Sequence, residues 1–271
     1  SLRLAEQAKR YLTERGQVCV VRGQEQEHGN AHCELPSGNV DGILVLGGDG
    51  TLLRAARELA GRKIPFLGIN LGHLGYLAEI EEQNLMPALD RLIEGSYTVE
   101  DRMMLRGSVC VDGQQIASDI ALNDIVLNRS GNLRVVDYKV YVNGEYLNSF
   151  TADGMIVSTP TGSTGYSLSA GGPIISPTAS MLVLTPICPH TKAMQPIVLN
   201  SSSVIEINVD NNNEEIYLTV DGQKVIKKED DEIITITKSE HCAEIILLDD
   251  YDYFNVLRKK ILYNSEKEEG E

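Results

Sequence analysis

Residues 47–51 place one carboxylate inside a glycine-rich stretch. The segment reads Gly-Gly-Asp-Gly-Thr and directly follows the apolar run GILVL at 42–46. Where a buried strand leads into a helix, an open α/β sheet presents backbone amides to ligands, and glycines let those amides approach phosphate oxygens. A carboxylate there would repel phosphate unless it handles a proton or a metal ion. We assign that role to Asp49 and expect phosphate contacts from Gly47, Gly48, Gly50 and Thr51.

A simpler interpretation of the same stretch is a plain turn. Asp49 would then cap the helix that begins near Thr51, and the glycines would supply positive φ angles. The chain contains no GxxxxGK[ST] sequence, which argues against a Walker-type ATPase. Phosphate binding here therefore requires another scheme.

A second candidate segment is LNDIVLNR at 122–129. Asn123 and Asp124 stand side by side at the start of an expected strand. An amide next to a carboxylate suits recognition of an adenine edge and a ribose hydroxyl. The alternative is an edge turn in which both side chains bond locally to the backbone.

The third segment, DGMIVSTPTGSTGYSLSAGGPI at 153–174, is rich in hydroxyl groups. Neutral hydroxyl donors suit a polyphosphate or a ribose, and the interspersed glycines allow close backbone approach. A serine-rich loop is the simpler interpretation, but Pro160 and the pair Gly171 and Gly172 give the segment defined edges. The expected ligand contacts are Thr161, Thr164, Gly165, Tyr166 as an aromatic wall, Ser167, Leu168 and Ser169.

The elements around the first segment alternate between helix and strand. Helical spacing at 2–12, the apolar stretch QVCVV at 17–21, the strand at 42–46, a helix at 51–60, a strand at 64–69 and a helix ending at Gly95 follow in order. This pattern predicts a small, doubly wound, Rossmann-like α/β domain over residues 1–97.

After Tyr97 the hydrophobic period becomes two. Stretches such as LRVVDYKVYVNGEYL and EEIYLTVDG alternate polar and apolar residues between Asp-Gly and Asn-Gly turns. We therefore predict an all-β, sandwich-like domain over 98–248. A helix at about 249–263 is expected to pack back on the first domain, and the cleft between the two domains is the default ligand site.

Composition excludes several classes of protein. The net charge of −15 over 271 residues argues against a general nucleic-acid binder. Five widely spaced cysteines form no zinc-ligand pattern and are interpreted as reduced, mostly buried thiols. Without an apolar run of about 18 residues or a signal-peptide pattern, we expect no membrane partner and a cytoplasmic location.

The three segments together resemble the signature blocks of NAD kinases, bacterial type. GGDGT by itself is shared with diacylglycerol and sphingosine kinases and, more distantly, with phosphofructokinases, whereas the segments at 122–129 and 153–174 resemble the NAD kinase blocks specifically. The resemblance implies transfer of a phosphoryl group from ATP to the adenosine 2′-hydroxyl of NAD. Asp49 would be the general base, and magnesium would be carried by the triphosphate.

The resemblance also implies further site residues. Asp153 would contact the nicotinamide half of NAD, Gln223 would lie near the ligand, and Tyr76 would pack beside the adenine. Arg134 and Arg54 are the candidate phosphate cations, although each is equally interpretable as a surface charge. Relatives often carry alanine at Gly165 and arginine at Thr151, and they assemble as homodimers or homotetramers. His73 is interpreted as a loop histidine without a chemical role.

Two other functions remain open from the sequence. A kinase of the GGDGT group that acts on a lipid or a sugar would keep Asp49 but need a different acceptor site. A dinucleotide sensor without catalysis would keep Asn123, Asp124 and Tyr166 but would not need Asp49. A structural scaffold would leave the glycine-rich segments unexplained.

Overall fold

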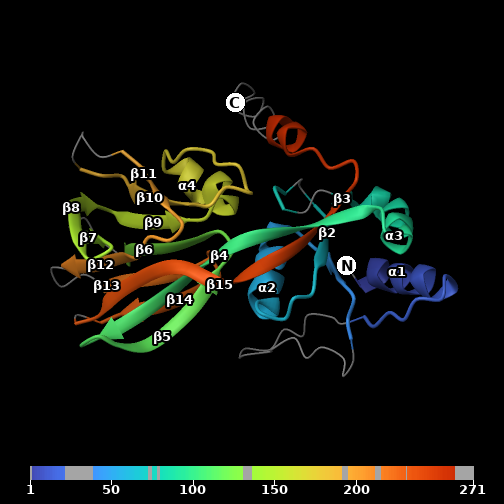
Figure 1. Ribbon diagram of the computed structural model, residues 1–271, viewed down its shortest axis with the longest axis horizontal. Helices are drawn as coiled ribbons and strands as arrows, with labels where there is room; N and C mark the ends of the chain where they lie inside the picture. The colour runs from blue at the N-terminus through green and yellow to red at the C-terminus, as the bar shows by residue number, and fades with distance from the viewer. Residues whose placement is uncertain are drawn as a thin grey trace. The chain divides into compact units, whose positions relative to one another are not determined.

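The computed structural model of the chain forms two compact units (Figure 1). It describes residues 2–21, 39–72, 75–77, 80–130, 136–190, 195–210, 215–229 and 231–259. One unit comprises Ser1–Glu100 with Glu244–Glu271, and the other comprises Asp101–Ala243. The chain therefore leaves the first unit and returns to it at its carboxyl-terminal end.

The first unit is an α/β structure built on short parallel strands. Its elements are α1 (Leu2–Glu14), β1 (Ile43–Leu46), α2 (Asp49–Leu59), β2 (Phe66–Asn70), β3 (Ile80–Glu81), the 3-10 turn η1 (Glu82–Asn84) and α3 (Leu85–Glu94). Strand β2 pairs in parallel with β1, with β3 and, at Phe66, with the end of β15 (Ile233–Leu248). Residues of α1, α3 and these strands share one apolar core, which includes Ala8, Leu67, Ile69, Leu89 and Ile246.

The apolar residues that recur at helical spacing in the sequence are buried in this unit. The apolar positions Leu52, Leu53, Ala56 and Leu59 of α2 are all buried, as the 3.6-residue period requires. Helix α3 ends at Gly95, whose φ of 75° is the left-handed conformation typical of a glycine cap.

Two expectations from the sequence are wrong. Residues 17–21 form no strand, since Val18 is 97% exposed and Val20 is 57% exposed, and an apolar stretch without a pairing partner has no ladder to join. The described cysteines are also not buried: Cys19 and Cys110 are half-buried, and Cys188 and Cys242 are exposed free thiols.

The second unit is a β-sandwich. One sheet has the order β11 (Ile197–Asn200), β10 (Met181–Ile187), β9 (Gly154–Ser158), β6 (Asp124–Ser130), β13 (Glu215–Val220) and β14 (Lys224–Lys228). In the other sheet β15 is followed by β12 (Ile205–Asp210), β7 (Val136–Val142) and β8 (Glu145–Ala152), with the hairpin of β4 (Tyr97–Val111) and β5 (Gln114–Ala121) attached to β15. One buried cluster takes residues from both sheets, which makes it the core of the sandwich.

Three hairpins of this unit turn through the same pair of left-handed residues. Asp112-Gly113, Asn143-Gly144 and Asp221-Gly222 have positive φ at both positions, from 49° to 80°. The first two hairpins have two-residue loops, which this conformation favours, whereas the third has a three-residue loop at 221–223. The Asp-Gly and Asn-Gly turns predicted from the sequence are confirmed.

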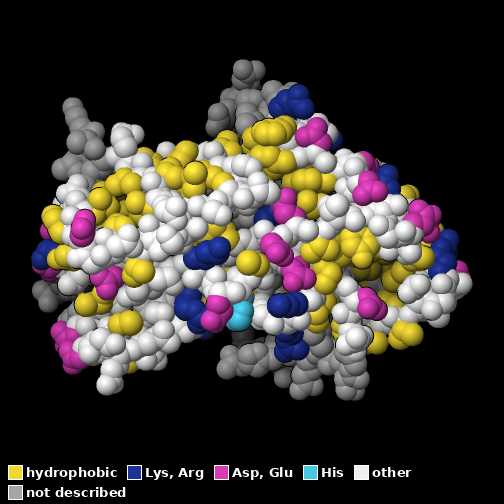
Figure 2. Space-filling model, in the orientation of Figure 1, with side chains coloured by type: hydrophobic (Ala, Val, Ile, Leu, Met, Phe, Trp, Pro, Cys, Tyr) yellow, Lys and Arg dark blue, Asp and Glu magenta, His cyan; other side chains and the backbone are white. Residues whose placement is uncertain are grey.

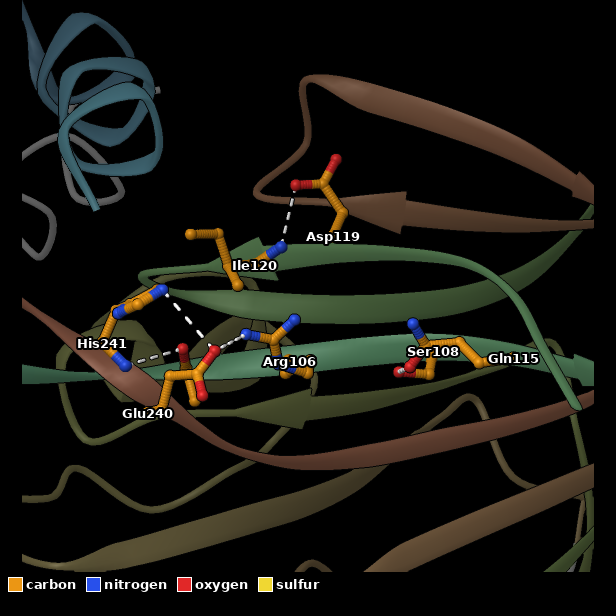
Figure 3. A network of polar contacts seen from close by, with 8 residues as sticks. Arg106, Ser108, Gln115, Asp119, Ile120, Glu240 and His241 are labelled. Carbon is orange, nitrogen blue, oxygen red and sulfur yellow. Dashed lines mark hydrogen bonds and ion pairs between the residues drawn. The ribbon is translucent and has the colours of Figure 1, made fainter. Parts of the chain in front are cut away.

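A polar network joins strands β4, β5 and β15 on the surface of the second unit (Figure 3). Arg106 Nη2 donates to Glu240 Oε1 at 2.5 Å, and His241 Nε2 lies 3.6 Å from the same oxygen. Glu240 is 69% exposed, so this ion pair adds little to stability.

Exposed side chains of every kind are interspersed on the face shown in Figure 2, where basic, acidic and apolar groups alternate. Among the described residues, no helix has the length and apolarity that a membrane crossing requires.

The carboxyl-terminal segment is helical over residues 253–259. Residues 249–252 of the predicted helix are not helical, and residues 260–263 lie outside the described part of the chain. Asp252 caps this helix, because its Oδ1 accepts the backbone N–H groups of Phe254 and Asn255.

Candidate active site

The glycine-rich segment lies between β1 and α2, at the strand-to-helix junction that the sequence predicted. A side chain on Gly47 would overlap that of Thr51, so this position has to remain glycine. A Cβ on Gly48, by contrast, would have no neighbour within 4 Å. The amino terminus of the 11-residue helix α2 thus borders open space, and its partial positive charge favours an anion there.

The carboxylate of Asp49 is bound by a loop that follows β2. Its Oδ2 accepts the backbone N–H of Tyr76 at 2.7 Å, and its Oδ1 accepts that of Leu77 at 3.1 Å. Gly75 approaches so closely that a Cβ there would overlap the carboxylate. The N-cap residue of α2 is Gly48, and no side-chain hydrogen bond caps the helix at this end. The interpretation of Asp49 as a helix cap is therefore wrong.

Three other residues considered from the sequence belong to this unit. Tyr76 is half-buried, and burial, followed by the nearby Tyr253 and Asp49, raises the pKa of its hydroxyl. The guanidinium of Arg54 is 47% exposed and lies 3.5 Å from Glu58, one turn along the same helix. His73 lies outside the described residues.

In the second unit, Asn123 and Asp124 stand at the start of β6, as predicted. Strand β6 lies between β9 and β13 in the middle of its sheet, so the turn that leads into it is not at a sheet edge, as the simpler interpretation required. The Oδ1 of Asn123 is buried and has no hydrogen-bond partner among the described residues. That interpretation also required a local bond, which this oxygen does not make.

The turn at 122–124 is held from one side by Asp221, a residue that the sequence analysis interpreted only as part of a hairpin. Its Oδ2 accepts the N–H of Leu122 at 3.0 Å, and its Oδ1 accepts the N–H groups of Asn123 at 2.8 Å and Asp124 at 3.2 Å. Asp221 is 7% exposed. Asp-Gly is a common turn sequence, and nothing in it indicates that the carboxylate has distant partners.

The third segment holds the same turn from the other side. Thr159 donates its N–H to Asn123 O at 2.8 Å and its hydroxyl to Leu122 O at 2.6 Å. The backbone of Gly162 runs so close that a Cβ would lie 2.6 Å from Asn123 Cα. The second and third sequence segments are thus brought into direct contact.

A pocket of about 350 Å³ opens at this junction. In the part of the chain that the structure describes, its lining includes two amides and two carboxylates but no Lys, Arg or His. Burial, and then the charge of Asp221, raise the pKa of Asp124 to about 7, so that near neutral pH this group is partly a hydrogen-bond donor. The lining residues are Asn123, Asp124, Val126, Asn128, Tyr166, Thr219, Asp221 and Gly222.

The hydroxyl-rich stretch forms a 3-10 turn, η2 (Thr161–Thr164), and a four-residue helix, α4 (Tyr166–Ser169). Thr161 is 7% exposed, and its Oγ1 has no partner among the described residues. Ser167 is buried and shares a hydrogen bond of 2.9 Å with Thr185, which gives it a structural role. Thr164 donates back to Thr161 O, Leu168 is half-buried, and Ser169 is exposed.

Asp153 belongs to a separate polar cluster that does not line the pocket. Its Oδ1 accepts from Arg129 Nη2 at 2.8 Å and lies 3.8 Å from His190 Nε2. Thr151 donates its hydroxyl to Asp137 at 2.5 Å. Neither Arg129, the last residue of the LNDIVLNR segment, nor His190 was predicted as a site residue from the sequence.

The last two candidates are Gln223 and Arg134. Gln223 is exposed next to the Asp221 turn and does not line the pocket. Arg134 lies outside the described residues.

Comparisons with known proteins agree with this arrangement. Residues 3–97 match the family model of the ATP-NAD kinase N-terminal domain, and residues 122–248 match that of the ATP-NAD kinase C-terminal domain. The chain is 47% identical over 234 residues to an NAD kinase of Clostridium beijerinckii, which covers 86% of this chain and 82% of that protein. It is 42% identical over 262 residues to an NAD kinase of Geotalea daltonii, with 95% and 92% covered.

Solved structures show the same fold. Yeast NADH kinase complexed with NADH superposes with a TM-score of 0.75 at 30% identity, over 83% of this chain and 67% of that one. An NAD kinase from Archaeoglobus fulgidus in complex with ATP gives a TM-score of 0.69 at 32% identity, over 82% of each chain. The predicted combination of an α/β part and a β-rich part is confirmed.

Proposed function

The chain belongs to the ATP-NAD kinase family and phosphorylates NAD to NADP, and we propose that Asp49 is the general base of this reaction. The adenosine 2′-oxygen attacks the γ-phosphorus of the triphosphate as the bond to the bridging oxygen breaks, and ADP leaves. Asp49 takes the proton of the attacking hydroxyl. The observation that supports this role is the carboxylate at the amino terminus of α2, oriented by the N–H groups of Tyr76 and Leu77.

The glycine-rich segment would bind the phosphates of the donor. The open space at Gly48 and the positive end of α2 favour a phosphate group beside Asp49. Gly47, Gly50 and Thr51 belong to the same junction. This placement brings the base and the transferred phosphoryl group together, so that positioning supplies much of the rate.

The pocket in the second unit would hold the adenosine part of NAD. The buried Asn123 Oδ1, which has no partner among the described residues, suits an N–H donor of a base, and Asp124 suits a ribose hydroxyl. Tyr166, 48% exposed on the pocket wall, offers an aromatic face for stacking. Other contacts with NAD or ATP are proposed for Arg54, Tyr76, Arg134, Thr151, Asp153, Thr161, Thr164, Gly165, Ser167, Leu168, Ser169 and Gln223.

Magnesium is proposed as part of the donor substrate. When bound to the triphosphate, it would neutralise charge on the phosphate oxygens. Within the described ranges, no group of three or more His, Cys, Asp or Glu side chains is arranged to hold a metal ion. A homodimer or homotetramer and a cytoplasmic location complete the proposal.

The test is an assay for NADP formation from NAD and magnesium ATP with Asp49→Asn, alongside Asp41→Asn as a control. Asp41 is an exposed aspartate just before β1. We expect Asp49→Asn to lower kcat by about 10²- to 10⁴-fold, the usual contribution of a general base, while the Kd for NAD changes little. The control should keep its activity. If Asp49→Asn instead loses NAD binding at unchanged kcat, Asp49 is a ligand contact and not the base.

A further inference from the structure

We infer that Asp221 is a positioning residue for NAD, whose carboxylate fixes the backbone at 122–124 so that Asn123 and Asp124 face the pocket. The inference rests on the proposed role of these two side chains in holding NAD. It concerns a residue of a hairpin turn that lies 98 positions along the chain from Asn123.

The backbone at 122–124 is bound at every polar group. Asp221 accepts the three N–H groups and donates its own N–H to Asp124 O at 3.0 Å. Thr159 binds the two remaining carbonyl groups, those of Leu122 and Asn123. Since all six groups are engaged, the conformation of this turn is set by two residues outside it, and the orientation of its side chains follows.

The hairpin itself does not require a buried carboxylate. Asp112 occupies the same place in the β4–β5 hairpin, with the same φ of 49° and a following glycine of positive φ, and its side chain is exposed. Asp221 is 7% exposed and lines the pocket. The β4–β5 loop has two residues and the β13–β14 loop has three, and only Asp221 makes the contact with residues 122–124. That contact is what its buried carboxylate serves.

A positioning role predicts a selective kinetic effect. If the N–H groups lose their acceptors, the turn at 122–124 gains freedom and the pocket binds the nucleoside less well. The donor site in the other unit and the base are untouched. The KM for NAD should therefore rise, whereas the KM for ATP and kcat should change little.

The experiment compares Asp221→Asn with the matched control Asp112→Asn in steady-state kinetics. Asparagine tolerates a φ of +49°, so the turn is retained, but its NH2 group would face N–H donors. We expect at least a tenfold rise in the KM for NAD for Asp221→Asn, with the KM for ATP and kcat within threefold of the parent. Asp112→Asn should match the parent in all three.

Thr159 supplies a second, independent variant. Thr159→Val removes the hydroxyl that donates to Leu122 O and accepts the N–H of Gly162, and Thr159→Ser keeps both contacts. Thr159→Val should have a higher KM for NAD than the parent, and Thr159→Ser should have the KM of the parent. If Asp221→Asn does not fold, this pair carries the same test, because it releases the same turn from the opposite side.

Asn123→Ala separates failure of this inference from failure of the proposed NAD contact. An unchanged KM for NAD in Asn123→Ala would show that Asn123 does not contact NAD, which is the premise of the inference. A raised KM in Asn123→Ala together with an unchanged one in folded Asp221→Asn would overturn the positioning role. A fall in kcat alone would also overturn it, since Asp221 would then act in the chemical step.

Discussion

Asp124→Asn should make the second unit more stable above about pH 5, and the gain should depend on pH in a defined way. Burial and the neighbouring Asp221 raise the pKa of Asp124 from 3.8 to about 7, which means that folding disfavours the charged form. Between pH 4 and 7 the folded state therefore binds more protons than the unfolded state, and the free energy of unfolding falls as pH rises. Below pH 4 both states hold the proton, so the penalty is absent; above pH 7 it is constant.

The size of this effect follows from the same shift. A rise of about three pKa units corresponds to about 4 kcal/mol, at about 1.4 kcal/mol for each unit. Asp124 is 6% exposed, so solvent screens the interaction little. Asparagine keeps the shape of the side chain but has no charge. Its advantage over aspartate should grow across this window towards a few kcal/mol.

The assay is urea unfolding of the parent, Asp124→Asn and Asp112→Asn from pH 4 to pH 8. Circular dichroism is the suitable signal, because the chain contains no tryptophan. Exposed Asp112 is the control, and its variant should follow the parent at every pH. A difference between Asp124→Asn and the parent that is the same at pH 4 and pH 8 would refute the reasoning, because it would show that Asp124 has no raised pKa in the folded protein.

The remaining predictions concern glycines that lie against site residues. Gly75→Ala should abolish NADP formation in a folded protein, because the new methyl group would displace the Asp49 carboxylate; full activity would show that the loop adjusts and that its contact with Asp49 is not needed. Gly162→Ala should weaken NAD binding at least tenfold in calorimetry, since its Cβ would overlap the Asn123 backbone. Gly42→Ala is the control: its Cβ would lie 3.5 Å from Pro65 O and 3.7 Å from Ile246 Cδ1, which is ordinary van der Waals contact, so binding should stay within threefold. Equal effects of the two alanines would contradict the proposed tight approach at Gly162.

Local pattern predicted the parts of the structure that depend on neighbours in sequence. The junction at Gly47–Thr51, the start of β6 at Asn123 and Asp124, and the Asp-Gly and Asn-Gly hairpins all follow from residue type and spacing. The strand at 17–21 failed because an apolar stretch says nothing about whether a partner strand is available.

The non-local parts of the site could not be predicted in this way. The N–H groups that hold Asp49 belong to backbone atoms of Tyr76 and Leu77, and any residue but proline provides such a group. Asp221 was missed for a related reason: its turn is common, and its partners lie about a hundred residues earlier in the chain. Hydrogen-bond partners that lie this far apart in the sequence can be identified only once the order of the strands in the sheet is known.

The attachment of the turn at 122–124 also has a consequence for biosynthesis. Its two anchors, Thr159 and Asp221, emerge from the ribosome 37 and 99 residues after Leu122, so the pocket cannot assemble while the first strands of the sandwich are being made. Contacts of such long sequence separation form late and make folding slow. A nascent chain that ends before β13 would expose an unanchored β6 with one open edge, because only its other neighbour, β9, has already been made. We therefore expect ligand binding to appear abruptly, when the β13–β14 hairpin closes, rather than gradually along the growing chain.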